Sequence, residues 1–166
     1  MTSSLVTINA AAAGPLAEGC RGLACSRHAH AGRSVLAVTS IQKELWVDAA
    51  GAAVAFYQSA FGATVLHRVG EGDDIVAQLG VGDAAFWVSA AGASIQRLSP
   101  RAIGGATSRT LLVVDDPDAL FERAVAAGAT ATAPVGNDHG WRLGRIVDPF
   151  GHEWEIGAPL GPWPPT

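Results

Sequence analysis

Glu155 is the acidic side chain whose setting matters most for chemistry in this sequence. It lies in the stretch DPFGHEWEI at residues 148–156. Proline fixes φ and glycine supplies a turn conformation, so the first four residues predict a tight corner with a strand after it. Side chains alternate along a strand, which places Trp154 and Ile156 on the core face and Glu155 on the opposite face. The carboxylate is therefore expected to point either to water or into a cavity.

Two histidines are further candidates for acid or base chemistry. An imidazole has an unperturbed pKa near neutrality, as general acid–base catalysis at physiological pH requires, and His67 and His139 are the candidates here. The alternative for both is a surface or structural role, which is the commoner one for a lone histidine on a strand or loop. His152 follows the turn glycine and is interpreted as part of the corner.

The two cysteines, Cys20 and Cys25, lie close together near the N-terminus and are followed by two histidines. This cluster superficially resembles a zinc site, but zinc sites normally lie in a framework of hydrophobic periodicity that this part of the chain lacks. Residues 1–34 are therefore interpreted as an Ala/Gly-rich arm with incidental cysteines. The role of the arm stays open.

The rest of the chain shows the same succession of elements twice. Hydrophobic patterns and turn residues predict a strand at 41–47, a helix at 49–61 and strands at 64–69, 75–81 and 84–89. An aperiodic linker at 90–108 separates these from strands expected at 110–114, 130–134, 142–147 and 152–156 and a helix at 117–127. The matching pairs Val47-Asp48 and Val114-Asp115 give an internal repeat of about 67 residues.

Two copies of such a unit predict an α+β fold. The expected architecture is two tandem βαβββ modules, 41–90 and 108–158, in a domain at 35–159 that a Pro-rich tail follows at 160–166. Side by side, the modules would form a curved eight-stranded mixed sheet with helices outside and a concave cavity inside, where a small ligand can bind. Trp46 and Trp154 are expected on the helix side of the sheet, in the core.

Four motifs carry a family resemblance: DPFGHEWEI at 148–156, GWR at 140–142, AFYQSAFGA at 55–63 and VDDPDA at 114–119. They resemble the vicinal-oxygen-chelate superfamily of glyoxalase, bleomycin-resistance and extradiol-dioxygenase proteins, most of all its PhnB-like branch. The resemblance covers about residues 41–159. It implies the paired-module fold, commonly completed by homodimerisation, and it leaves the reaction open because this fold hosts several unrelated chemistries.

The resemblance also implies where a metal ion would bind. Metal-using members hold a divalent ion on four ligands, typically His, Gln or Glu, and the corresponding positions here are Ile41, Trp87, Arg109 and Glu155. Only Glu155 is a metal ligand, and a divalent ion needs several donors without a neighbouring positive charge. No cofactor is therefore expected, although Gln42 would restore one ligand if the first strand slipped by one residue. A divalent metal on Glu155 stays the alternative.

The replaced positions predict a different kind of site. If Arg109 and Glu155 face each other in the cavity, they can form a charge-assisted pair where the metal would have been; the alternative is a solvent-exposed pair worth little. Trp87 would form an aromatic wall of the cavity, and Gln78 would supply both a hydrogen-bond donor and an acceptor. Trp141 would lie at the cavity rim. These five residues are the predicted ligand-binding residues.

Composition restricts the partners. A net charge of −4 and a pI near 5.6 make nucleic acid and acidic membrane surfaces poor candidates. The chain has no apolar run of the roughly eighteen residues that a membrane span needs and no signal-peptide pattern at its start, so a cytoplasmic location is expected. The expected partners are a small molecule and, to cover open strand edges and apolar helix faces, a second copy of the chain in a homodimer.

Two functions are compatible with these observations. The first is a metal-free protein that binds a small aromatic or drug-like molecule, and it is supported by the loss of three ligand positions to Ile, Trp and Arg. The alternative is an enzyme, either a metal-dependent lyase, isomerase or dioxygenase, or a metal-free catalyst that uses a histidine or Glu155. Neither the ligand nor the substrate can be named from the sequence.

Overall fold

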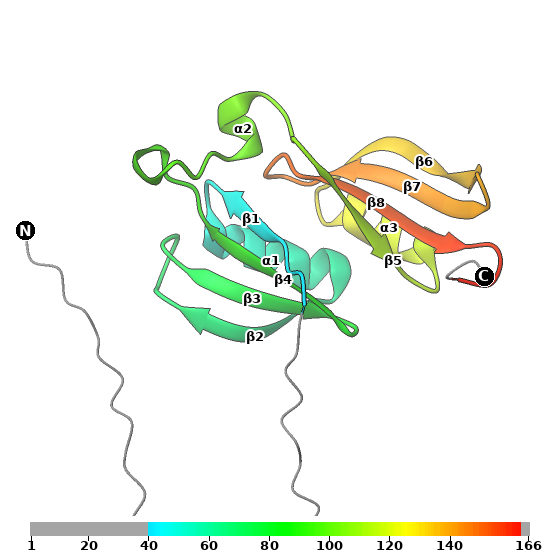
Figure 1. Cartoon of the computed structure of the whole chain (residues 1–166), viewed down its shortest axis with the longest axis horizontal. Coiled ribbons are helices and arrows are strands. Elements are labelled where there is room, and N and C mark those ends of the chain that lie inside the picture. Colours follow the sequence, from blue (N-terminus) through cyan, green and yellow to red (C-terminus); the bar gives the residue numbers. More distant parts are fainter. Residues whose placement is uncertain (1–39, 164–166) are drawn as a thin grey trace, which may run out of the picture. The chain divides into compact units, whose positions relative to one another are not determined.

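The computed structural model describes residues 40–163. The arm at 1–34, with Cys20 and Cys25, lies outside the described residues, as does the end of the tail. In the described part, the chain forms two βαβββ modules joined by a linker, and Figure 1 shows each module as a sheet with one helix against it. The predicted α+β fold with two modules is confirmed.

The first module consists of β1 (Glu44–Val47), α1 (Ala50–Phe61), β2 (Thr64–Val69), β3 (Val76–Val81) and β4 (Ala84–Ala90). Its strands follow the order β1-β4-β3-β2, with β1 parallel to β4 and the other pairs antiparallel. Helix α1 buries one apolar face on this sheet and ends at Gly62, whose φ of 67° is the left-handed conformation expected there.

The second module consists of β5 (Arg109–Val113), α3 (Pro117–Ala126), β6 (Thr130–Asp138), β7 (Trp141–Val147) and β8 (Glu153–Pro159). Its order, β5-β8-β7-β6, repeats that of the first module. The sequence explains the start of α3, because the Asp116 side chain accepts a hydrogen bond from the Ala119 N–H (3.0 Å) and Pro117 occupies the first turn.

The eight strands form two four-stranded sheets, where the sequence predicted a single eight-stranded sheet. The linker, expected to lack structure, contains a short 3-10 helix at Ala93–Ile95 and the single-turn helix α2 (Pro100–Ile103), which the Ser99 side chain caps. No helix among residues 40–163 is long and apolar enough to cross a membrane.

The two modules share one aromatic core. The ring of Trp154 on β8 lies 4.8 Å from that of Phe61 and 5.7 Å from that of Tyr57, both on α1, and 5.5 Å from Phe86 on β4. Trp154 is buried, as predicted. A side chain near the C-terminus therefore completes the core of the first module.

Asp148 links the modules by hydrogen bonds at the corner between β7 and β8. Its Oδ2 accepts bonds from the Tyr57 hydroxyl (2.5 Å) and the Trp154 indole (2.9 Å). Its Oδ1 accepts bonds from the backbone N–H groups of Phe150 and His152 (both 2.9 Å), which confirms His152 as part of the corner. Burial and the neighbouring carboxylate raise the pKa of Tyr57 well above its usual value, so the hydroxyl stays a donor.

Strand β1 faces the opposite way from the prediction. Leu45 and Val47 are completely buried against α1, so Trp46, expected in the core, lies on the other face and is only half-buried. Gln42 belongs to that same face, whereas Ile41 is fully exposed to solvent. Burial of the two aliphatic side chains, Leu45 and Val47, decides which face of β1 packs against α1, and the single indole of Trp46 is left on the other face.

Candidate ligand-binding site

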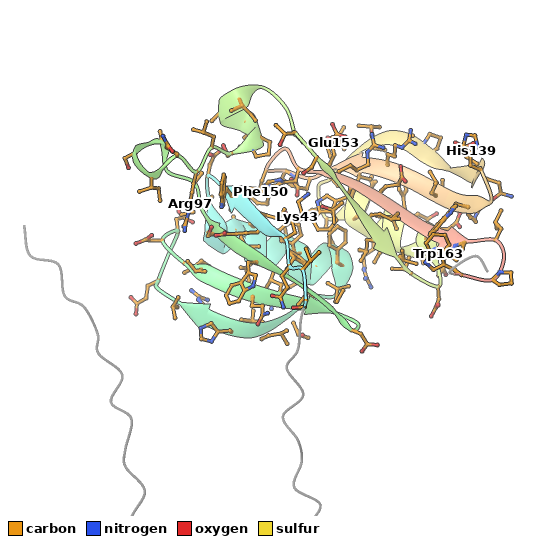
Figure 2. The ribbon with its side chains drawn as sticks, in the orientation of Figure 1. Lys43, Arg97, His139, Phe150, Glu153 and Trp163 are labelled. Carbon is orange, nitrogen blue, oxygen red and sulfur yellow. The ribbon has the colours of Figure 1, made fainter. Side chains whose placement is uncertain are left out.

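A cavity of about 370 Å³ lies on the face of the second sheet that points away from α3. Alternation along β7 places Trp141, Leu143 and Arg145 on this face, and the register sets Arg145 directly opposite Glu155 on β8. In Figure 2, His139 lies at the turn between β6 and β7, and Trp163 lies beyond the end of β8. The residues that line the cavity are Leu111, Asp138, His139, Trp141, Leu143, Arg145, Glu155 and Trp163.

A glycine makes room for the aromatic wall of this cavity. Gly157 on β8 pairs with Leu143 on β7. A Cβ atom at Gly157 would lie 3.0 Å from the Leu143 Cβ and 3.5 Å from the Trp141 ring. The indole of Trp141 also packs edge-on against that of Trp163, with ring centroids 4.9 Å apart. Trp141 and Trp163 thus form one aromatic end of the cavity.

Glu155 is the centre of the charged end. Its Oε2 accepts hydrogen bonds from the Nε of Arg145 (2.7 Å) and an Nη of Arg109 (3.3 Å), while the Nε of Arg109 lies 3.4 Å from Glu153. The side chain of Glu155 is 17% exposed, against 40% for Arg145 and 44% for Arg109. The hydrogen bond that Arg145 donates to Glu155 raises the pKa of Arg145. The predicted pair of Arg109 and Glu155 exists, but Arg145 is the closer partner and Arg109 faces solvent.

The other two predicted ligand residues form a separate cluster on the first sheet. Gln78 and Trp87 face each other across β3 and β4, and both donate to the Oε1 of Gln42, at 2.8 and 2.7 Å. The exposed His67 lies beside them, with its ring 6.1 Å from that of Trp87. Within residues 40–163, no hydrogen bond or ion pair connects this cluster to Glu155. The five predicted residues therefore fall into two groups on two sheets.

The comparisons with known proteins agree on the family. The sequence model of the Glyoxalase/Bleomycin resistance protein/Dioxygenase superfamily matches residues 35–156. The chain belongs to this superfamily. Uncharacterized relatives from Mycobacterium bovis and Mycobacterium tuberculosis are 34% identical over 128 residues, which cover 73% of this chain and 84% and 75% of the relatives.

Several solved structures share the fold. A gene product of Arabidopsis thaliana has a TM-score of 0.57 at 29% identity, with 72% of this chain and 98% of that chain covered. TioX from Micromonospora sp. ML1 has a TM-score of 0.57 at 26% identity, with 77% and 100% covered. FosX of Listeria monocytogenes, a fosfomycin resistance protein solved with Mn(II), is 15% identical at a TM-score of 0.58, with 76% and 93% covered. This last likeness shows the fold alone.

The residues of this superfamily member do not fit a divalent metal. In the part of the chain that the structure describes, no three His, Cys, Asp or Glu side chains gather where they could hold an ion. Trp87 and Arg109, at two of the family's ligand positions, have no lone pair to offer. A metal ion on Glu155 would also have to displace two guanidinium groups.

Sequence reasoning missed Arg145, the closest partner of Glu155. The signal was present, because strand positions at equal distances from the corner face each other in a hairpin. Trp163, in the Pro-rich tail, was not among the five predicted ligand-binding residues. His139, a predicted acid–base candidate, is at the rim, where its side chain is 93% exposed and its Nε2 lies 3.3 Å from Asp138.

Proposed function

We propose that this protein binds a small planar aromatic molecule in the cavity on its second sheet, and that it does so without a metal ion. The observation that carries the proposal is the pairing of Glu155 with two arginines at one end of a cavity whose other end is formed by Trp141 and Trp163. The PhnB-like branch is the part of the superfamily that we propose for this chain, on the motifs at 55–63 and 148–156.

The cavity has the size and the two surfaces that such a ligand needs. Its volume of about 370 Å³ lies in the range typical of small-molecule sites, roughly 300–1,000 Å³. The indole of Trp141, with Leu111 and Leu143 beside it, offers an apolar face on which a flat ring can stack. Arg145 and Glu155 offer a donor and an acceptor next to each other, which would orient a polar substituent of the ring.

Charge balance supports binding over metal-dependent chemistry. The negative charge of Glu155 is compensated by Arg145 and Arg109, so the site attracts a divalent cation weakly. A planar aromatic ligand does not need an uncompensated negative charge on the protein. The metal-dependent form of the enzyme alternative would require a donor set that residues 40–163 do not assemble around Glu155.

Titration with naphthalene compounds tests the ligand class. We expect 2-naphthol and 2-naphthoate to shift the indole NMR signals of Trp141 and Trp163 saturably, and cyclohexanecarboxylate to bind far more weakly. Trp141→Leu should raise the Kd about two- to tenfold, since an aromatic pair contributes about 0.5–1.5 kcal/mol beyond burial. Trp87→Leu, which removes an indole from the first sheet, is the matched control and should leave the Kd unchanged.

Two results would contradict the proposal. The first is equal loss of affinity in Trp87→Leu and Trp141→Leu, because it would place the ligand elsewhere. The second comes from elemental analysis of the purified protein: about one equivalent of zinc, nickel, manganese or iron, lost in Glu155→Gln, would establish a metal site.

A further inference from the structure

A second cavity, of about 170 Å³, lies at the outer edge of β1, away from the site on the second sheet. It is bordered by β1, the linker around α2, the residues just before β5 and the corner before β8. Its apolar wall includes Trp46, Leu98 and Ile103, and its polar residues include Lys43, Ser108 and His152. The volume equals that of about five or six waters in the liquid, which limits a ligand to a single ring or a short chain.

Lys43 is the cation of this cavity and the only lysine of the chain. Its Nζ donates hydrogen bonds to the hydroxyls of Thr110 (2.7 Å) and Ser108 (3.1 Å). No described carboxylate lies within 4.0 Å of the Nζ, so its partners are neutral. An ammonium carries three N–H bonds, and two neutral acceptors leave one of them free.

The charge of Lys43 is not neutralised by a direct carboxylate partner among the described residues, so an anion could bind beside it. Desolvation lowers the pKa of Lys43, and the charge of the buried Asp148 partly offsets this effect. Both oxygens of Asp148 are already occupied by four donors. Glu44, which also lines the cavity, is exposed and accepts a bond from Ser89 (2.7 Å). Desolvation lowers the pKa of His152, which keeps the ring neutral at pH 7.

Three lining residues have a donor without an acceptor among residues 40–163. The indole Nε1–H of Trp46 is buried and has no hydrogen-bond partner in the part of the chain that the structure describes. The hydroxyl of Ser108 accepts from Lys43, which leaves its own proton to donate. The carbonyls of Lys43 and Val47 accept from β4, so the N–H of Glu44 points to the open edge of β1. An acceptor-bearing ligand would satisfy the donors of Ser108 and Glu44, two residues that line the cavity.

We propose that this cavity binds a small apolar monocarboxylate, with Lys43 as the counter-ion of the carboxylate and the wall of Trp46, Leu98 and Ile103 against its ring or chain. A carboxylate supplies an acceptor for the free N–H of Lys43 and for the hydroxyl of Ser108, and a negative charge beside the ammonium of Lys43. The apolar wall favours a hydrocarbon body over a second charged group. This inference is independent of the function proposed for the second sheet.

Titration of the full chain with benzoate and with benzamide, the neutral compound of the same shape, tests the proposal by NMR. The probes are the indole signal of Trp46, assigned by Trp46→Phe, and the side-chain signals of isotope-labelled lysine, which arise from Lys43 alone. We expect benzoate to shift both saturably, and benzamide to bind at least tenfold more weakly.

Variants sharpen the test. Lys43→Met should weaken benzoate at least tenfold, and Ser108→Ala, which keeps the cation, should weaken it several-fold if Lys43→Met does not fold. Arg68→Met, the loss of one exposed cation on β2, is the matched control and should change nothing. Equal binding of benzamide, full affinity in Lys43→Met, or shifts confined to Trp141 and Trp163 would each overturn the proposal. The last result would place benzoate in the cavity of the second sheet.

Discussion

Tyr57→Phe tests whether Asp148 holds the two modules together. The change removes one hydroxyl and keeps the ring that packs against Trp154. The lost bond runs from the hydroxyl to a buried carboxylate at 2.5 Å, and bonds to charged groups contribute about 1.5–3 kcal/mol. Asp148 keeps its three other donors, so we expect the free energy of unfolding to fall by about 2 kcal/mol.

Urea denaturation followed by circular dichroism measures this change, with an unchanged m-value as evidence that the folded state is intact. Asp148→Asn should cost about 3 kcal/mol or more, because it places an amide N–H₂ among buried donors. The double variant should cost less than the sum of the two, with a coupling of about 1–2 kcal/mol. Asp118→Asn, at an exposed pair with Arg142, is the matched control and should cost less than about 1 kcal/mol.

A link between the modules through Asp148 is refuted if Tyr57→Phe costs less than about 0.5 kcal/mol and its effect simply adds to that of Asp148→Asn. That outcome would mean that the carboxylate does not depend on the hydroxyl from α1. The modules would then be joined by aromatic packing alone.

Two further predictions concern pH and assembly. Because burial lowers the pKa of His152 in the folded state, the unfolded chain takes up the proton first as the pH falls. Below about pH 6.5, the free energy of unfolding should therefore decrease by at most about 1.4 kcal/mol per pH unit. His152→Asn should flatten this part of the pH profile of the melting temperature, and an unchanged profile would contradict this role of His152. We also propose a homodimer, since Leu111 and Val113 are 45% and 48% exposed on β5; light scattering that shows a monomer at micromolar concentration would contradict it.

The sequence predicts the elements of this fold well and the facing of one strand badly. Turn residues and a repeat were enough to locate eight strands and two helices, because glycine and proline mark boundaries that tertiary contacts rarely move. The facing of β1 was wrong because Leu45, Trp46 and Val47 are all apolar and give no alternation. Only packing against α1 decides which of them are buried.

The sequence predicted Glu155 at the charged end of the site but not its closest partner, Arg145. Glu155 was expected opposite the core face because Trp154 and Ile156 flank it, and the structure has it there. Its partner Arg145 depends on hairpin register, which the hydrogen bond from the N–H of Asp148 to the carbonyl of His152 (2.9 Å) fixes. The site residues of two different sheets could not be separated from a linear pattern, because that requires the packing of the modules.

The large sequence separation between Tyr57 and Asp148 has a consequence for biosynthesis. The hydrogen bond between Tyr57 and Asp148 joins residues 91 positions apart. The rings of Phe61 and Phe86 pack against the indole of Trp154, which is synthesised after Asp148. The first module therefore emerges from the ribosome with part of its apolar surface uncovered. Contacts of such long sequence separation form slowly, so this apolar surface stays uncovered until β8 has been synthesised and has packed.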